Sequence, residues 1–229
     1  MNFYKNISRF ATVNWLKSFW VNLYYFNFTK ALHFPILIGY GTKIESLGDK
    51  HALHVENKFA SFCFGLKKAP FALGNYSNYW HIGKNSSLHI EGSCRMAKGV
   101  NMKLFNDANL YIGDGFSSNA NLIISCASSI TFGKDCLLGW NITIMDNDGG
   151  HFILDKYSNI VLNNPQEIKV GNHVWIGAES SILKGSIIPN DCVVGFKSNI
   201  CGIKDPVSYN TILVGNPAKS KKENIVWTR

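Results

Sequence analysis

A six-residue repeat of aliphatic positions runs through the last third of the chain. Four residues after most of these positions stands a small or β-branched residue. The aliphatic series is Val170, Ile176, Ile182, Ile188, Val194 and Ile200, and the second series is Val174, Ser180, Ser186, Cys192 and Ser198. A period of six is neither the 2 of an ordinary strand nor the 3.6 of an amphipathic helix. It predicts one short strand and one turn per unit, with three units forming a triangular coil that buries its apolar face against neighbouring coils.

The same spacing occurs earlier in the chain, with weak members and one slip. Asn106 and Ser118 occupy apolar positions of the frame. The frame shifts by two residues after Ile130 and continues with Phe132. Its other members are Ile82, Leu88, Cys94, Val100, Ile112, Ile124, Leu138 and Ile144. The sequence therefore predicts an all-β solenoid over residues 36–204, with the aliphatic side chains inside and the small residues near the corners.

Three regions lie outside the repeat. Residues 1–35 predict an aromatic-rich helical extension, residues 149–167 an excursion loop, and residues 205–229 a C-terminal cap. Leu16, Phe19, Trp20 and Leu23 share one helical face. From Met1 to Lys30 the chain carries four basic side chains and no acidic one. This helix either packs its aromatic rings on the solenoid or on another subunit, or lies on an anionic membrane.

The composition sets further limits. A formal charge of +8 favours anionic ligands without choosing among them. The six scattered cysteines form no CxxC pair, which indicates reduced thiols in a cytosolic protein. Charged residues interrupt the N-terminus, so we expect neither a signal peptide nor a membrane span. The basic residues are scattered and form no known module, which disfavours nucleic-acid binding.

The candidate chemistry lies where the repeat is interrupted. The run Asp146-Asn147-Asp148-Gly149-Gly150-His151 follows an expected strand. Two glycines permit unusual backbone angles, and an imidazole can take a proton from an alcohol. His151 is the candidate general base, with Asp146 or Asp148 orienting its ring. The alternative is a surface histidine in a loop shaped by its Asp and Asn residues.

The stretch from about residue 119 to 217 resembles the hexapeptide-repeat acyltransferases. It is most similar to the sugar O-acetyltransferases of capsule and lipopolysaccharide synthesis and to the galactoside and maltose acetyltransferases. The resemblance rests on the Asp-x-Asp-Gly-Gly-His loop and on the segments Ile168–Gly177, Ile182–Gly185 and Val214–Ala218. It implies a left-handed β-helix, acetyl-CoA as co-substrate, no metal, a sugar acceptor, and a homotrimer with active sites between subunits.

The resemblance also implies roles for individual residues. His151 matches the catalytic base, and Asn119 matches an asparagine that places the acceptor. Trp175 matches a tryptophan of the acetyl-CoA cleft, and Lys219 a basic residue near the CoA phosphates. The rest of the implied CoA path consists of Gly177, Ala178, Gly195, Phe196, Lys197 and Lys204. This chain departs from the family pattern in an extra glycine before His151, in the Gly195–Ser198 turn and in the spacing to Lys204.

Each of these assignments has a structural alternative. Asn119 could form a ladder with asparagines of neighbouring coils, Trp175 could be an aromatic without a ligand, and Lys219 could belong to a solvated charge cluster. The predicted reaction is direct transfer of acetyl to a hydroxyl of a surface-polysaccharide sugar, in the cytoplasm, either free or peripheral at the inner membrane face. The rival functions are N-acetylation of an amino sugar-nucleotide, a non-catalytic scaffold, and a metal enzyme. The last needs three facing histidines from His81, His89, His151 and His173.

Overall fold

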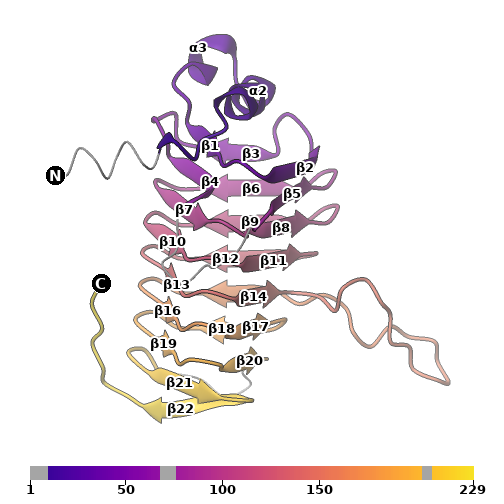
Figure 1. Cartoon of the computed structure of the whole chain (residues 1–229). Helices are drawn as coiled ribbons and strands as arrows, with labels where there is room; N and C mark the ends of the chain where they lie inside the picture. The colour runs from indigo at the N-terminus through magenta and orange to yellow at the C-terminus, as the bar shows by residue number, and fades with distance from the viewer. Residues whose placement is uncertain (1–9, 68–75, 203–207) are drawn as a thin grey trace.

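The strands wind into a stack of triangular coils in this computed structural model, which describes residues 10–67, 76–202 and 208–229. Successive strands pass in turn to three sheets, and each strand pairs in parallel with the corresponding strand of the next coil (Figure 1). The nine-stranded sheet 1 holds β1 Ile36–Ile38, β4 Phe62–Lys67, β7 Cys94–Ala97, β10 Phe116–Ser118, β13 Leu137–Leu138, β16 Trp175–Ile176, β19 Val193–Val194, β21 Ile212–Gly215 and β22 Ala218–Lys222. This arrangement confirms the predicted all-β solenoid.

The other two sheets complete the prism. Sheet 2 holds β2 Thr42–Leu47, β5 Asn78–Ile82, β8 Asn101–Leu104, β11 Leu122–Cys126, β14 Ile142–Met145, β17 Ser181–Leu183 and β20 Asn199–Cys201. Sheet 3 holds β3 Leu53–Val55, β6 Ser87–Ile90, β9 Asn109–Ile112, β12 Ser129–Phe132, β15 Ile168–Val170 and β18 Ile187–Ile188. The last strand, β22, pairs antiparallel with β21 and ends sheet 1.

The length of a coil changes along the stack. In the later coils Trp175 pairs with Val193, a separation that corresponds to three six-residue units. Nearer the N-terminus, Ser87 pairs with Asn109 and donates a hydrogen bond to its side chain across a sequence separation of 22. The prediction that six residues make one side of the prism is therefore wrong for the first coils. Several of their strands are longer, such as β2, β4 and β5, and the ring of Trp80 packs among phenylalanines there.

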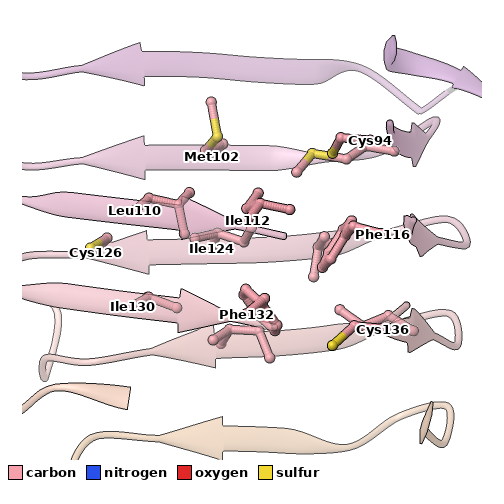
Figure 2. Packing of buried hydrophobic residues seen from close by; sticks show 14 of the residues in the cluster. Cys94, Met102, Leu110, Ile112, Phe116, Ile124, Cys126, Ile130, Phe132 and Cys136 are labelled. Carbon is pink, nitrogen blue, oxygen red and sulfur yellow. The ribbon is translucent and has the colours of Figure 1, made fainter. Parts of the chain in front are cut away.

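The interior of the prism holds the aliphatic series of the repeat. The six members from Val170 to Ile200 are at most 3% exposed, and the five corner residues from Val174 to Ser198 at most 2%. Both predicted positions are confirmed. Figure 2 shows how side chains of successive coils stack, with Phe132 edge-on to Phe116 at a ring-centroid distance of 5.2 Å.

The first coil is closed by a helix that turns a polar face inward. Helix α2 spans Trp15–Tyr25, and α3 spans Phe28–Ala31. The buried Asn22 amide donates to the Ile36 carbonyl at 2.7 Å and accepts from the Ile36 N–H at 3.1 Å. The Ser18 hydroxyl accepts from the Ile38 N–H at 2.9 Å. These bonds satisfy backbone groups of β1, which is the edge strand of sheet 1 in the part of the chain that the structure describes and would otherwise leave them unpaired.

Because the polar face points inward, part of the apolar face points to solvent. Leu16 is 70% exposed and Trp20 60% exposed. At the end of the same helix, the Tyr24 and Tyr25 hydroxyls donate to backbone carbonyls at the end of β2, so some of its aromatic rings do pack on the solenoid. Among the described residues, no helix is long and apolar enough to cross a bilayer.

Two segments leave the prism. Residues 146–167, here called the arm, project between β14 and β15, and 223–229 run back along its outside (Figure 1). Five of the six cysteines are buried, and Cys201 is exposed. The predicted division into extension, solenoid and cap, with boundaries after residues 35 and 204, stays a proposal. β1 begins at Ile36, and the second boundary falls in a segment outside the described residues.

Candidate active site

The arm carries His151 away from the prism at the edge where sheet 2 runs into sheet 3. Gly149 and Gly150 adopt left-handed φ angles of +76° and +91°, which L side chains rarely adopt. The His151 side chain is exposed, and its ring makes no hydrogen bond to any part of the chain that the structure describes. Both ring nitrogens are therefore available to a substrate.

The base of the arm is fastened by one buried amide that the sequence analysis did not identify. Asn163 donates to the Asp148 carboxylate at 3.0 Å and to the His151 carbonyl at 2.8 Å, and accepts from the Ile153 N–H at 2.7 Å. Lys184 forms an ion pair with Asp148 at 2.6 Å. The Lys184 ammonium, followed by the Asn163 amide, lowers the pKa of Asp148. An asparagine in a polar loop gives no sequence signal for this role, because its partners lie 10 to 15 residues away.

Asp146 is occupied in holding a turn. Its carboxylate is buried and accepts from the backbone N–H groups of Ala127 and Ser128 at 2.7 and 2.8 Å. These bonds fix the turn between β11 and β12. Within the described chain, neither Asp146 nor Asp148 hydrogen-bonds the His151 ring, so the structure does not bring either carboxylate to the position expected for orienting it.

A groove of about 420 Å³ lies along the edge where sheet 1 runs into sheet 2. Its volume is within the range usual for small-molecule sites, and its lining is mainly apolar. It brings together the predicted Asn119, Trp175, Gly177, Ala178, Gly195 and Phe196. The sequence analysis missed the other lining residues, which are Leu137, Leu138, Gly139, Trp140, Val193 and Val194.

A repeated corner motif forms the floor of the groove. Three successive coils turn through an apolar residue, a glycine and a variable residue: Leu138-Gly139-Trp140, Ile176-Gly177-Ala178 and Val194-Gly195-Phe196. A Cβ on Gly177 would lie 2.7 Å from the Val194 carbonyl oxygen, so glycine lets the coils stack closely here. This repeated motif is the sequence signal that could have identified Trp140 as a residue of the groove.

For two side chains of the groove, Asn119 and Trp175, the sequence analysis also gave roles without a ligand, and the contacts in the structure bear on them. The asparagine ladder joins Asn121 to Asn141 at 2.9 Å and does not include Asn119. Within the described residues, the Asn119 amide makes no side-chain hydrogen bond. Trp175 is 42% exposed and faces the groove.

Of the predicted lysines, neither Lys197 nor Lys219 lines the groove. Lys197 adjoins the groove, pairs with Glu179 at 3.2 Å and lies over the Phe196 ring. Lys219 is exposed on β22 and does not line the groove. Lys204 lies outside the described residues.

No group of three or more metal-ligating side chains lies together in the residues that the structure describes. Of the histidines considered for a metal site, His81 belongs to sheet 2, His89 to sheet 3 and His173 to a turn between sheets 3 and 1. The structure does not bring them together.

Comparison with known proteins identifies the family to which the chain belongs. No family model matches the chain. The polysialic acid O-acetyltransferase of Neisseria meningitidis is 33% identical over 180 residues, which cover 69% of this chain and 82% of the relative. A putative lipopolysaccharide biosynthesis O-acetyl transferase, WbbJ of Escherichia coli K12, is 27% identical over 62% of this chain and 75% of its own length.

A solved structure agrees with these relatives. The crystal structure of the polysialic acid O-acetyltransferase OatWY superposes with a TM-score of 0.53 at 26% identity, over 85% of this chain and 87% of that one. The relatives, the coiled fold and the groove agree on one assignment. The chain belongs to the hexapeptide-repeat, left-handed β-helix O-acetyltransferases, enzymes that transfer an acetyl group from acetyl-CoA to a hydroxyl group.

Proposed function

We propose that this enzyme acetylates a hydroxyl group of a sugar in a surface polysaccharide or its precursor, with acetyl-CoA bound in the groove. The observation that carries this proposal is the convergence of six predicted residues on one apolar groove of suitable volume. The acceptor class is supported by the relatives, whose names refer to polysialic acid and to lipopolysaccharide biosynthesis.

The proposed reaction is direct transfer. His151 removes the proton from the acceptor hydroxyl as its oxygen attacks the thioester carbonyl, and the imidazolium then returns the proton to the leaving thiolate. The developing oxyanion needs preorganised donors. The backbone N–H of Ala178 lines the groove and donates no hydrogen bond within the described chain, so it is a candidate for binding a carbonyl or oxyanion of the ligand.

A homotrimer would complete this site. In one chain, His151 leaves the edge between sheets 2 and 3, whereas the groove follows the edge between sheets 1 and 2, and His151 does not line it. Three prisms around a threefold axis can place the arm of one subunit beside the groove of the next. The arm also exposes six large apolar side chains that a neighbour would cover, namely Phe152, Ile153, Leu154, Tyr157, Ile160 and Leu162.

We further propose that the N-terminal end of the prism contacts an anionic membrane. Exposed Leu16, Trp20, Phe28 and Leu32 lie on α2, α3 and the residue after α3. Beside α2 lies an open, mainly apolar groove of about 470 Å³ whose lining includes Lys17 and Lys50. Apolar side chains with nearby lysines suit an interface with acidic headgroups. In a trimer whose threefold axis runs parallel to the prisms, the three N-terminal ends would lie on the same side and could contact one membrane.

The function is tested by following thiol release from acetyl-CoA with a panel of polysaccharides, sugar nucleotides and amino sugar-nucleotides. We expect release with a hydroxyl-bearing glycan, and a product that gains one acetyl group and loses it in mild alkali, as an ester does. An alkali-stable product formed only from amino sugars would identify an N-acetyltransferase instead. Absence of transfer to every glycan would contradict the proposed acceptor class.

Membrane contact is tested by co-sedimentation with vesicles. We expect binding to vesicles containing phosphatidylglycerol, weaker binding to pure phosphatidylcholine, and a decrease with added salt because exposed charges are screened. A variant with Leu16→Ser and Trp20→Ser should lose this binding, since both side chains are more than half exposed. Equal binding by the variant, or none by the wild type, would contradict the proposal.

A further inference from the structure

The C-terminal residues 225–229, here called the strap, cross the prism at the edge where sheet 3 runs into sheet 1. The strap begins beside Asn210, where the Ile225 N–H donates to the Asn210 carbonyl at 3.0 Å. It ends at Arg229, which donates to the Gly115 carbonyl at 2.7 Å and lies 3.9 Å from Asp135. The strap therefore joins turns of well-separated coils, and Figure 1 shows it rising outside the strands of sheet 1.

Trp227 is the anchor of the strap. It is 8% exposed, although the preceding Val226 is 86% exposed. Its indole N–H donates to the His173 carbonyl at 2.9 Å, and its ring stacks on the His173 ring at 4.0 Å with an interplanar angle of 6°. The His173 ring is in turn held by Asp191 at 2.9 Å. Trp227 is therefore fixed by its hydrogen bond and by stacking on the His173 ring, which Asp191 holds in place.

The same indole contacts a wall of the groove. The rings of Trp227 and Trp175 lie 6.1 Å apart at 45°. Trp175 faces the groove, whereas Trp227 does not line it. The strap thus supports Trp175 through a side chain that does not line the groove. A half-exposed tryptophan without such support would occupy several rotamers and lose entropy when a ligand fixes it.

We propose that Trp227 is a positioning residue that holds Trp175 at the wall of the acetyl-CoA groove and thereby sets the affinity for the co-substrate. This inference rests on the proposed function of the groove. It assigns the strap to co-substrate binding and not to the chemical step, because Trp227 contacts His173 and Trp175, and within the described chain no hydrogen bond or ring contact joins it to His151. Aromatic pairs contribute enough to change a binding constant by about threefold to tenfold.

The test measures the Michaelis constants in Trp227→Ala, with Val226→Ala as the matched control in the same strap. We expect the KM for acetyl-CoA and the dissociation constant of CoA by calorimetry to rise about threefold to tenfold in Trp227→Ala. The kcat should stay within about twofold, as for loss of binding that the ground and transition states share. Val226→Ala should behave as the wild type, and Trp227→Phe should recover part of the affinity because it keeps the stack.

A purely structural strap gives a different result. It would lower the unfolding midpoint in Trp227→Ala while leaving both CoA constants unchanged, and that result would overturn the inference. An equal rise in Val226→Ala would do the same. If Trp227→Ala does not fold, unchanged CoA constants in Trp227→Phe also overturn the inference. Failure of the wild type to bind CoA at all would instead remove the proposed function, and the inference with it.

Discussion

Replacing His151 with alanine should lower the kcat for acetyl transfer at least about a hundredfold, because general-base catalysis contributes on that order or more. The ring is exposed, makes no hydrogen bond within the described chain and is carried by a fastened arm, so its loss should not disturb packing. The measurement is thiol release under saturating acetyl-CoA and acceptor. The dissociation constant of CoA should stay near that of the wild type, since the proposed role of His151 is proton transfer in the chemical step.

His51→Ala is the matched control, since His51 is an exposed histidine in the turn between β2 and β3, several coils away from the groove. It should retain wild-type turnover. Analytical ultracentrifugation should show three copies of the 25.6 kDa chain for the wild type and for both variants. Near-normal turnover in His151→Ala would refute the proposed base, and a monomeric active wild type would refute the intersubunit site.

Replacing Phe132 with alanine should cost about 3–5 kcal/mol of unfolding free energy, the usual cost of removing a buried phenylalanine. Phe132 is fully buried, packs edge-on against Phe116, and lies between Ile112 and Val170 of the adjacent coils. In a solenoid each coil is stabilised mainly by its two neighbours, so a cavity in a middle coil weakens both interfaces. Denaturant unfolding, followed by circular dichroism, measures the loss.

Thr131→Ala provides the control on the same strand, because this side chain points to the outer face and is only partly buried. It should cost well under half as much. Phe132→Leu, which keeps most of the apolar volume, should cost less than about 1.5 kcal/mol if neighbours repack. Equal midpoints for Phe132→Ala and Thr131→Ala would show that stacking at this position does not stabilise the coil.

The repeat could be predicted from sequence because it is local. In the later coils every side of the prism has six residues, so buried aliphatic positions recur without reference to distant segments. In the earlier coils the sides have unequal lengths, and the paired Ser87 and Asn109 are separated by more than three such units. The predicted members of the earlier frame are buried except Asn106, but a strict six-residue spacing does not continue from one coil to the next there.

The candidate site divides in the same way. Gly149 and Gly150 could be predicted because the local backbone has positive φ angles there. Gly177 could be predicted because it belongs to the repeat, and it lies where the next coil approaches closely. The partners of Asp146 could not be predicted. A carboxylate that orients a catalytic histidine and a carboxylate that fixes a distant turn can occur in the same local sequence. The buried position of Asn22 could not be predicted either, because its amide is satisfied by the Ile36 backbone at the edge of sheet 1.

By itself the sequence determined the solenoid, its inward positions, the arm with His151 and half of the residues that line the groove. These follow from short spacings, in which a residue's neighbours in space are a fixed number of positions along the chain. Only the tertiary structure decided that His151 and the groove occupy different edges, that helix α2 leaves part of its apolar face exposed, and that Trp227 reaches His173 across 54 residues. Those contacts join segments whose separation follows no period, so their partners are fixed only when the coils have stacked.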